Sequence, residues 1–192
     1  MGRRAKNNAQ LRIIGGEFRS RTLHAPPGED TRPSASRMRK AIFDLLISNY
    51  LRAGLADLDV ADLFAGSGAL GFEALSRGAN SLQSVEKSDR AIRCIHENAR
   101  ILGVQDRVHV RTMDLRIQVP SFVPAPHLIF CDPPYALDAS QLLQNISAQV
   151  REGAILCYEH SKDARPVLSA PWRLRTRRTW GAATVSIFEC IN

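Results

Sequence analysis

The sequence predicts an α/β protein whose core is a mainly parallel β-sheet with helices on both faces. Strand-like and helix-like patterns alternate between residues 58 and 158, which is typical of a parallel sheet. A glycine-rich loop at Gly66 follows the first of these strands and leads into a helix. Two further strand-like runs are joined through Gly181, so we expect an antiparallel hairpin at that edge of the sheet.

The N-terminal part is expected to be a small extension of the sheet domain. The predicted divisions are a disordered basic tail at residues 1–10, a hairpin and loop at 11–33 and the main domain at 34–192. Within the extension, Leu11–Ile14 and Arg21–Leu23 have the pattern of two short strands. The pair Gly15-Gly16 between them favours a turn, so a β-hairpin is predicted.

The main domain opens with a helix and then alternates. Ser34 or Ser36 is suited to cap a helix that runs to about Leu51. The predicted strands are 58–63, 81–85, 107–112, 127–131, 153–158, 172–179 and 182–190. The predicted helices that follow the first one are 69–77, 88–102 and 138–150.

The positive charge is concentrated at the N-terminus. The chain has a formal net charge of +7, and residues 1–40 alone hold 10 Lys and Arg against 3 Asp and Glu. Acidic and basic residues balance over the rest of the sequence. From composition alone, both a solvated tail and an arm that binds a polyanion stay open.

Several classes of protein are disfavoured by composition. No stretch of 18 apolar residues is present, so no membrane span or membrane partner is expected. The cysteines lie far apart without a CxxC pair, and no metal site is predicted; they are Cys94, Cys131, Cys157 and Cys190. Free cysteines in apolar runs favour a reduced, cytoplasmic setting.

The glycine loop predicts a cofactor site. Gly66, Gly68 and Gly71 have the spacing of a dinucleotide fingerprint, and Glu86 follows twenty residues later at a strand end. Asp62 directly before the loop would repel a pyrophosphate, whereas it suits a ligand with an ammonium group or ribose hydroxyls. This favours S-adenosylmethionine over a nicotinamide dinucleotide.

The expected cofactor contacts extend over the ends of three strands. Glu86 is suited to accept hydrogen bonds from two ribose hydroxyls, although a solvated strand-end residue is the alternative. Asp114 is suited to an adenine amino group, with a helix N-cap before Leu115 as the alternative. The predicted cofactor-binding residues are Asp62, Phe64, Ala65, Gly66, Ser67, Gly68, Glu86, Lys87, Asp114 and Leu115.

A second motif predicts the chemistry. Asp132-Pro133-Pro134-Tyr135 follows a buried-strand pattern, and ligands of open α/β sheets bind at such strand ends. An exocyclic amine of a base is a poor nucleophile, and acceptors aimed at its two N–H groups stabilise the cation formed on methyl transfer. The Asp132 side chain and the Pro133 carbonyl are predicted acceptors, Pro134 adds rigidity, and Tyr135 offers a face for base stacking.

These motifs together resemble a known family. The segments Asp62–Ala79, Glu86, Asp132–Tyr135, Arg12–Leu23 and Arg32–Leu46 are similar to the bacterial 16S rRNA guanine-N2 methyltransferases. The resemblance implies the class I methyltransferase fold, which is Rossmann-like and has seven strands with the last one antiparallel. It also implies S-adenosylmethionine as the cofactor and guanine N2 as the methylated atom.

The resemblance also gives the basic arm a function. Two positions depart from it, because members usually carry Asp and Glu where this chain has Ser36 and Lys40. The residues expected to hold RNA phosphates next to the site are Arg12, Arg19, Arg21, Arg32, Arg37, Arg39 and Lys40. The implied partner is 16S rRNA in the small subunit or an assembly intermediate, bound by a monomer. The target base would leave its stack to reach Tyr135.

Other functions compatible with the motifs are kept as alternatives. Adenine-N6 and protein-glutamine methyltransferases use related sites. A nicotinamide-dependent oxidoreductase and a non-catalytic RNA-binding protein are the alternatives from other classes. Arg173, Arg175 and Arg177 alternate in a strand-like run and form either a second RNA contact or a solvated strand face.

Overall fold

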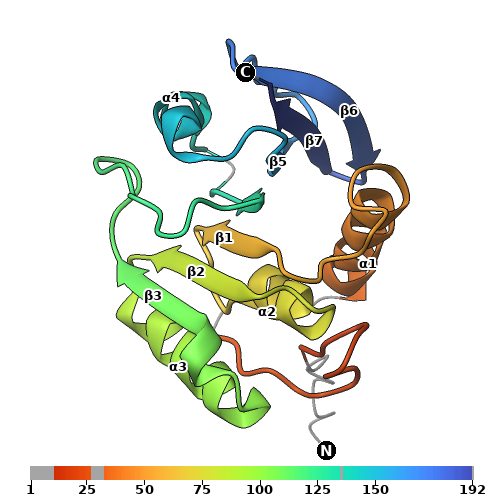
Figure 1. Cartoon of the computed structure of the whole chain (residues 1–192), viewed down its shortest axis with the longest axis vertical. Helices are drawn as coiled ribbons and strands as arrows, with labels where there is room; N and C mark the ends of the chain where they lie inside the picture. The colour runs from red at the N-terminus through yellow and green to blue at the C-terminus, as the bar shows by residue number, and fades with distance from the viewer. Residues whose placement is uncertain (1–10, 27–32, 135, 192) are drawn as a thin grey trace, which may run out of the picture.

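The computed structural model describes residues 11–26, 33–134 and 136–191, and this part of the chain contains a seven-stranded sheet (Figure 1). The strands are β1 Asp59–Leu63, β2 Ser81–Glu86, β3 Val108–Thr112, β4 Leu128–Cys131, β5 Ile155–Ser161, β6 Trp172–Trp180 and β7 Ala183–Cys190. Their order is β3-β2-β1-β4-β5-β7-β6. The first five strands pair in parallel, and β7 is antiparallel to both of its neighbours. The predicted fold class is therefore confirmed.

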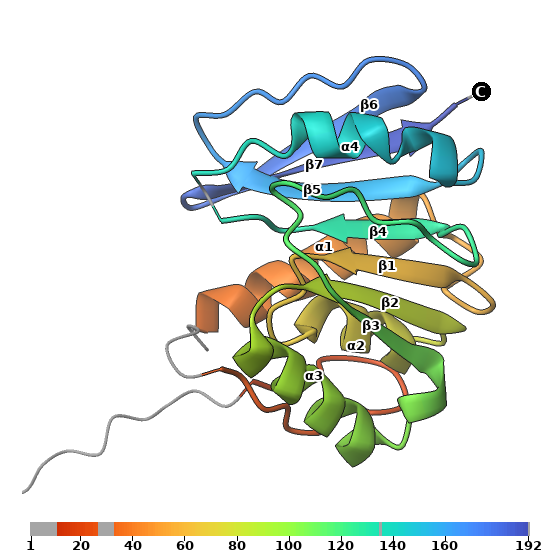
Figure 2. The same cartoon turned by 90° about the vertical axis from the view of Figure 1, so that its left-hand side faces the viewer.

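Helices cover both faces of the sheet. The helices are α1 Pro33–Asn49, α2 Ala69–Ser76, α3 Asp89–Leu102 and α4 Ser140–Asn145, with 3₁₀ turns at Gln105–Arg107 and Ser147–Gln149. Apolar side chains of α1, α2 and α3 share one core cluster with one face of the sheet. Side chains of α4 share a second cluster with the other face, and Figure 2 shows this layered arrangement. The described residues form no helix that is long and apolar enough to cross a membrane.

The N-terminal segment 11–26 differs from the predicted hairpin. Its two arms run antiparallel but form one isolated bridge, between Arg12 and Thr22, and no strand. The turn between them is attached to the end of α2 instead. The Glu17 N–H donates to the Ser76 carbonyl, and Gly16 lies so close that a Cβ there would be 1.8 Å from the same oxygen. Gly16 also has a φ of +79°, so only glycine fits this contact without strain.

A buried carboxylate of α2 also binds the backbone of segment 11–26. Glu73 in α2 has no solvent exposure, and it accepts hydrogen bonds of 2.8 Å from the backbone N–H groups of Ile14 and Gly15. Arg77 donates to Glu73 as well, and the Arg39 Nε lies 3.8 Å from it. Segment 11–26 is thus fixed to α1 and α2, and its apolar residues belong to the same core as these helices.

Two predicted elements need correction in length. The helix expected at 138–150 is the short α4 followed by a separate 3₁₀ turn. Strand β5 is longer than predicted and continues to Ser161, because it pairs with β7 along its whole length. The tail at residues 1–10 lies outside the described residues.

Candidate active site

Carboxylates gather at the carboxyl ends of all five parallel strands. Asp62 is the penultimate residue of β1, Glu86 ends β2, Asp114 follows β3 by two residues, Asp132 directly follows β4, and Glu159 is near the end of β5. A cavity of about 650 Å³ opens at this edge of the sheet. Its volume is in the range of small-molecule and cofactor sites.

The cavity brings together most of the residues predicted for the cofactor and the chemistry. Those that line it are Phe64, Gly66, Glu86, Lys87, Asp114, Leu115, Asp132, Pro133 and Pro134. Sequence reasoning missed Val85, Met113, Arg116, Ala136, Leu137 and Glu159, which line it too. Tyr135 lies outside the described residues, so its stacking function stays a prediction. The other predicted cofactor residues, Asp62, Ala65, Ser67 and Gly68, are not among those that line the cavity.

The glycine loop has the left-handed backbone that its glycines allow. Phe64, Gly66 and Gly68 all have positive φ angles, of 60°, 53° and 77°. A side chain on Gly68 would bring a Cβ to 2.8 Å from the ring of Phe72. The loop therefore turns tightly from β1 into α2, and Gly66 lies at the cavity wall.

Asp62 supports this loop from inside the protein. Its side chain is 2% exposed, and the Gly71 N–H in the first turn of α2 donates to its Oδ2 at 3.0 Å. Burial raises the pKa of this carboxyl well above its ordinary value, and the nearby carboxylates of Asp132 and Glu86 raise it further. The predicted direct contact of Asp62 with the cofactor does not fit this placement.

Glu86 is held in a fixed orientation at the cavity wall. Its Oε2 accepts the Gly66 N–H at 2.9 Å, and its Oε1 accepts the N–H groups of Lys87 and Ser88, both at 2.8 Å. Oε1 already accepts two donors, so the remaining lone pair for a ligand donor is on Oε2. Three backbone amides thus hold the carboxylate in position for a ligand hydroxyl.

Asp114 belongs to a polar cluster at the same end of the cavity. It caps no helix, because residues 115–117 form a turn, and its Oδ1 accepts the Arg116 N–H at 3.1 Å. The Arg116 side chain also donates to both carboxylate oxygens, and Lys87 Nζ lies 3.6 Å from Oδ2. These hydrogen bonds hold the pKa of Asp114 well below its ordinary value. Asp114 is therefore an acceptor at every ordinary pH.

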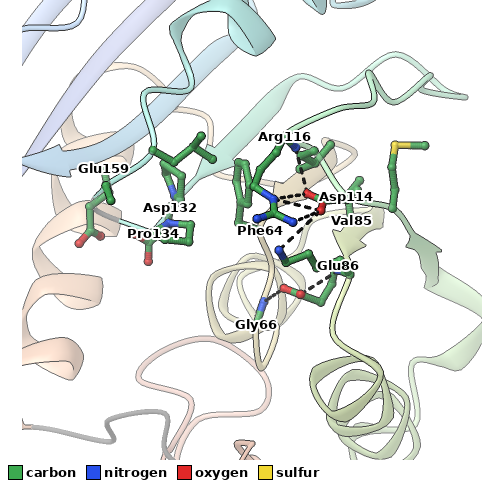
Figure 3. A pocket seen from close by; sticks show the side chains of 15 residues that line it. Phe64, Gly66, Val85, Glu86, Asp114, Arg116, Asp132, Pro134 and Glu159 are labelled. Atoms are coloured by element: carbon green, nitrogen blue, oxygen red, sulfur yellow. Dashed lines mark hydrogen bonds and ion pairs between the residues drawn. The ribbon is translucent and has the colours of Figure 1, made fainter.

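Asp132 and Pro134 lie at the other end of the cavity (Figure 3). The Asp132 N–H reaches the Leu63 carbonyl at 3.5 Å, and the Leu137 N–H donates to the Pro134 carbonyl at 2.8 Å. Pro133 is buried between the two exposed neighbours. In Figure 3, Phe64 lies between this end and the end with Glu86, Asp114 and Arg116.

This arrangement fits S-adenosylmethionine. Fixed acceptors for ribose hydroxyls and an adenine amino group are at one end, next to apolar walls from Val85 and Leu115. The close approach of backbone at Gly66 suits the middle of such a ligand. Several carboxylates in one cavity favour a cationic sulfonium over an anionic pyrophosphate.

The predicted RNA-binding residues do not form one surface. The chain reaches the amino-terminal edge of the sheet at the turn of segment 11–26, because this turn bonds to the end of α2. Arg19 lies in that turn, and Arg21 donates to the Ile101 carbonyl near the end of α3. The prediction that Arg19 and Arg21 lie next to the site is therefore wrong.

Arg39 also differs from the prediction, because it is buried. Its side chain is 6% exposed, donates to the Arg12 carbonyl at 2.7 Å and lies beside Glu73. Burial lowers the pKa of Arg39, and Glu73 counters this effect. Arg39 was predicted to bind phosphate, but it is buried beside Glu73 and has a structural role instead.

The remaining residues of the predicted arm have mixed placements. Arg37 and Lys40 are exposed in α1, which begins at the carboxyl edge of the sheet (Figure 2), and Lys40 pairs with Asp44. Arg12 is exposed in segment 11–26. Arg32 lies outside the described residues.

A second hollow, which is lined by two arginines and was not predicted from the sequence, lies between segment 11–26 and α3. It has a volume of about 410 Å³ and is lined by His24, Arg90, Arg93, Cys94 and Glu97. Asn98 on α3 binds both backbone groups of His24 and also donates to the Ser67 carbonyl of the glycine loop. Hydrogen bonds of Asn98 therefore connect one wall of the hollow to the glycine loop.

The arginines that alternate along β6 mostly form hydrogen bonds with other residues of the protein. Arg175 pairs with Glu189, while Arg177 donates to the Ser186 hydroxyl and to the Pro166 carbonyl. Arg173 is exposed on the same strand. These contacts favour a strand face over a second RNA contact, although Arg177 is half-buried and not fully solvated.

Comparison with known proteins identifies the family. The sequence profile of a family described as "Conserved hypothetical protein 95" matches residues 11–189. The chain is 30% identical over 190 residues to ribosomal RNA small subunit methyltransferase D of Escherichia coli K12, which covers 95% of this chain and 91% of the relative. The chain belongs to the ribosomal RNA small subunit methyltransferase D family. It is accordingly a class I methyltransferase, and its cofactor is S-adenosylmethionine.

Two solved structures share the fold of this chain. A hypothetical protein of Thermus thermophilus is 32% identical, with a TM-score of 0.72 over 93% of this chain and 99% of that one. The magnesium protoporphyrin IX methyltransferase of Synechocystis, solved with bound S-adenosylmethionine, is 14% identical with a TM-score of 0.62 over 82% of this chain and 80% of its own. That likeness shows the shared fold alone.

Proposed function

We propose that this methyltransferase transfers a methyl group to the exocyclic N2 of a guanine in 16S rRNA. The observation that carries the proposal is the cavity itself, which joins Glu86 and Asp114, the residues proposed for the cofactor, to Asp132, the residue proposed for the amine. The name of the Escherichia coli relative, a methyltransferase of small-subunit rRNA, supports the choice of substrate. The adjacent Pro133 and Pro134 support methylation of an amine bound to an sp² carbon.

The reaction depends on how the chain's own residues treat the amine. When bound, S-adenosylmethionine supplies an electrophilic methyl group on a sulfonium. The Asp132 carboxylate and the Pro133 carbonyl accept the two N–H groups of the amine and so draw its lone pair out of the ring system. Positive charge develops on this nitrogen during transfer, and the carboxylate stabilises it. The proton leaves the product ammonium after transfer.

The target base reaches this site outside its stack. The acceptors of Asp132 and Pro133 are in an opening at the sheet edge, and a base paired in a helix cannot enter it. Acidic residues around the cavity repel phosphates, so the backbone is held by basic residues outside it. Arg37 and the hollow beside Arg90 and Arg93 are described basic positions that flank the carboxyl edge.

The test is methyl transfer from labelled S-adenosylmethionine to unmethylated small subunits, naked 16S rRNA and DNA. We expect N2-methylguanine in the rRNA of one of the first two substrates. Asp132→Ala should lower kcat by about 100- to 1,000-fold, because one transition-state acceptor is lost, while rRNA binding is retained. Asp163→Ala, which changes an exposed aspartate outside the cavity, is the matched control. Methylated adenine or glutamine as the product, or unchanged transfer by Asp132→Ala, would contradict the proposal.

A further inference from the structure

Glu159 is the acidic residue of the cavity that the chemistry above does not use. Strands β4 and β5 pair with Cys131 beside Tyr158, so the next residues, Asp132 and Glu159, are neighbours at the strand ends. Glu159 is 8% exposed and lines the cavity. Figure 3 shows it grouped with Asp132 and Pro134, away from the end that holds Glu86 and Asp114. Glu159 therefore lies at the end of the cavity where the substrate amine is proposed to bind.

The edge of guanine that carries the N2 amine has a second donor next to it. The ring N1 of guanine bears a hydrogen, whereas the ring nitrogen beside the amine of adenine or cytosine has a lone pair. A carboxylate can only accept hydrogen bonds. Glu159 therefore matches the N1–H of guanine and opposes the lone pair of the other two bases.

We propose that Glu159 selects guanine by accepting its N1–H while Asp132 accepts its N2 amine. This inference rests on the proposed function, because it concerns the base at the same site. Neighbouring strands lie about 4.8 Å apart, which lets two side chains from β4 and β5 contact adjacent donors of one base edge. A wrong base leaves a nearly buried carboxylate facing a lone pair, and such mismatches discriminate far more strongly than the loss of apolar contact.

The test exchanges the acceptor for a side chain of the same shape that also donates. Glu159→Gln is assayed on small subunits whose 16S rRNA carries either guanine or 2-aminopurine at the nucleotide that the wild type methylates. 2-Aminopurine keeps the N2 amine but has a lone pair at N1. The wild type should prefer guanine by about 100-fold in kcat/KM, and Glu159→Gln should reduce this preference by about 10-fold or more, because its amide donates to N1.

The control and a second measurement separate this function from a structural one. Glu152→Gln changes an exposed glutamate outside the cavity and should keep the wild-type preference. S-adenosylmethionine binding to Glu159→Gln, measured by calorimetry, should equal that of the wild type. Equal losses on both bases, or weaker cofactor binding with an unchanged preference, would overturn the inference. Absence of N2-methylguanine with the wild type would instead overturn the proposed function.

Discussion

Replacing Glu73 with alanine should destabilise the fold strongly. Its two oxygens accept the N–H groups of Ile14 and Gly15 at 2.8 Å and the side chain of Arg77, and the Arg39 guanidinium is buried 3.8 Å away. Hydrogen bonds to a charged group are worth about 1.5–3 kcal/mol each, but they are not additive. Breaking a buried ion pair by removing one partner costs about 3–5 kcal/mol. We therefore expect Glu73→Ala to lower the unfolding free energy by about 4 kcal/mol.

The measurement is urea unfolding followed by tryptophan fluorescence, with the midpoint and slope fitted separately. Much of this loss in unfolding free energy arises because the buried charge of Arg39 has no partner in Glu73→Ala. The double variant Arg39→Met with Glu73→Leu removes the two most deeply buried charges and leaves Arg77, which is 16% exposed, so it should be more stable than Glu73→Ala by about 2 kcal/mol. A loss below about 1 kcal/mol for Glu73→Ala, or additive losses in the double variant, would refute this account of the N-terminal attachment.

Three other predictions concern the site and the RNA surface. Glu86→Gln should raise the Kd for S-adenosylmethionine by about 10- to 100-fold in calorimetry, because charged acceptors are lost; an unchanged Kd would contradict the assignment. Asp62 has a raised pKa, so the folded state binds its proton more tightly than the unfolded state does, and the unfolding free energy should fall as pH rises above its ordinary value of 3.8. Asp62→Asn keeps an acceptor for the Gly71 N–H, and it should flatten this decline in urea titrations at several pH values; a decline of the same slope would count against it. Arg37→Ala should weaken rRNA binding and reduce the salt slope by about one, whereas Arg19→Ala, at the opposite edge of the sheet, should do neither. Equal effects of the two variants would contradict the prediction that RNA binds at the carboxyl edge of the sheet and not at the amino-terminal edge.

Local sequence patterns were sufficient to predict the strands of the sheet domain. The buried strands are continuous apolar runs, such as Leu128–Cys131, and the end of each run falls within a few residues of the observed strand end. The glycine loop and Asp132 could be placed because strand ends share one edge. Glu159 obeys the same rule, because it directly follows the predicted strand 153–158. It was overlooked because, unlike Asp132, it belongs to no recognised motif.

Long-range partners account for what the sequence could not predict. Segment 11–26 resembles a hairpin locally, but the side chains that satisfy its backbone come from α2, about sixty residues later. Arg39 belongs to a basic run, and its burial depends on Glu73. Asp62 has the position of a ligand-binding residue, but its carboxylate accepts the Gly71 N–H as the loop folds back. For segment 11–26 and Arg39, a side chain distant in sequence decides between a solvent-facing and a buried orientation. For Asp62 the partner is a backbone N–H nine residues later, in a loop whose folding the sequence pattern did not reveal.

The insertion of β7 between β5 and β6 has a consequence for the order of folding. Strand β5 pairs with β7 over seven residues, and β6 has β7 as its one neighbour in the sheet. Until residues 183–190 pair, β5 has an open edge and β6 has no partner strand. Such edges promote pairing between partly folded chains, so aggregation is expected to be most favoured before β7 has docked.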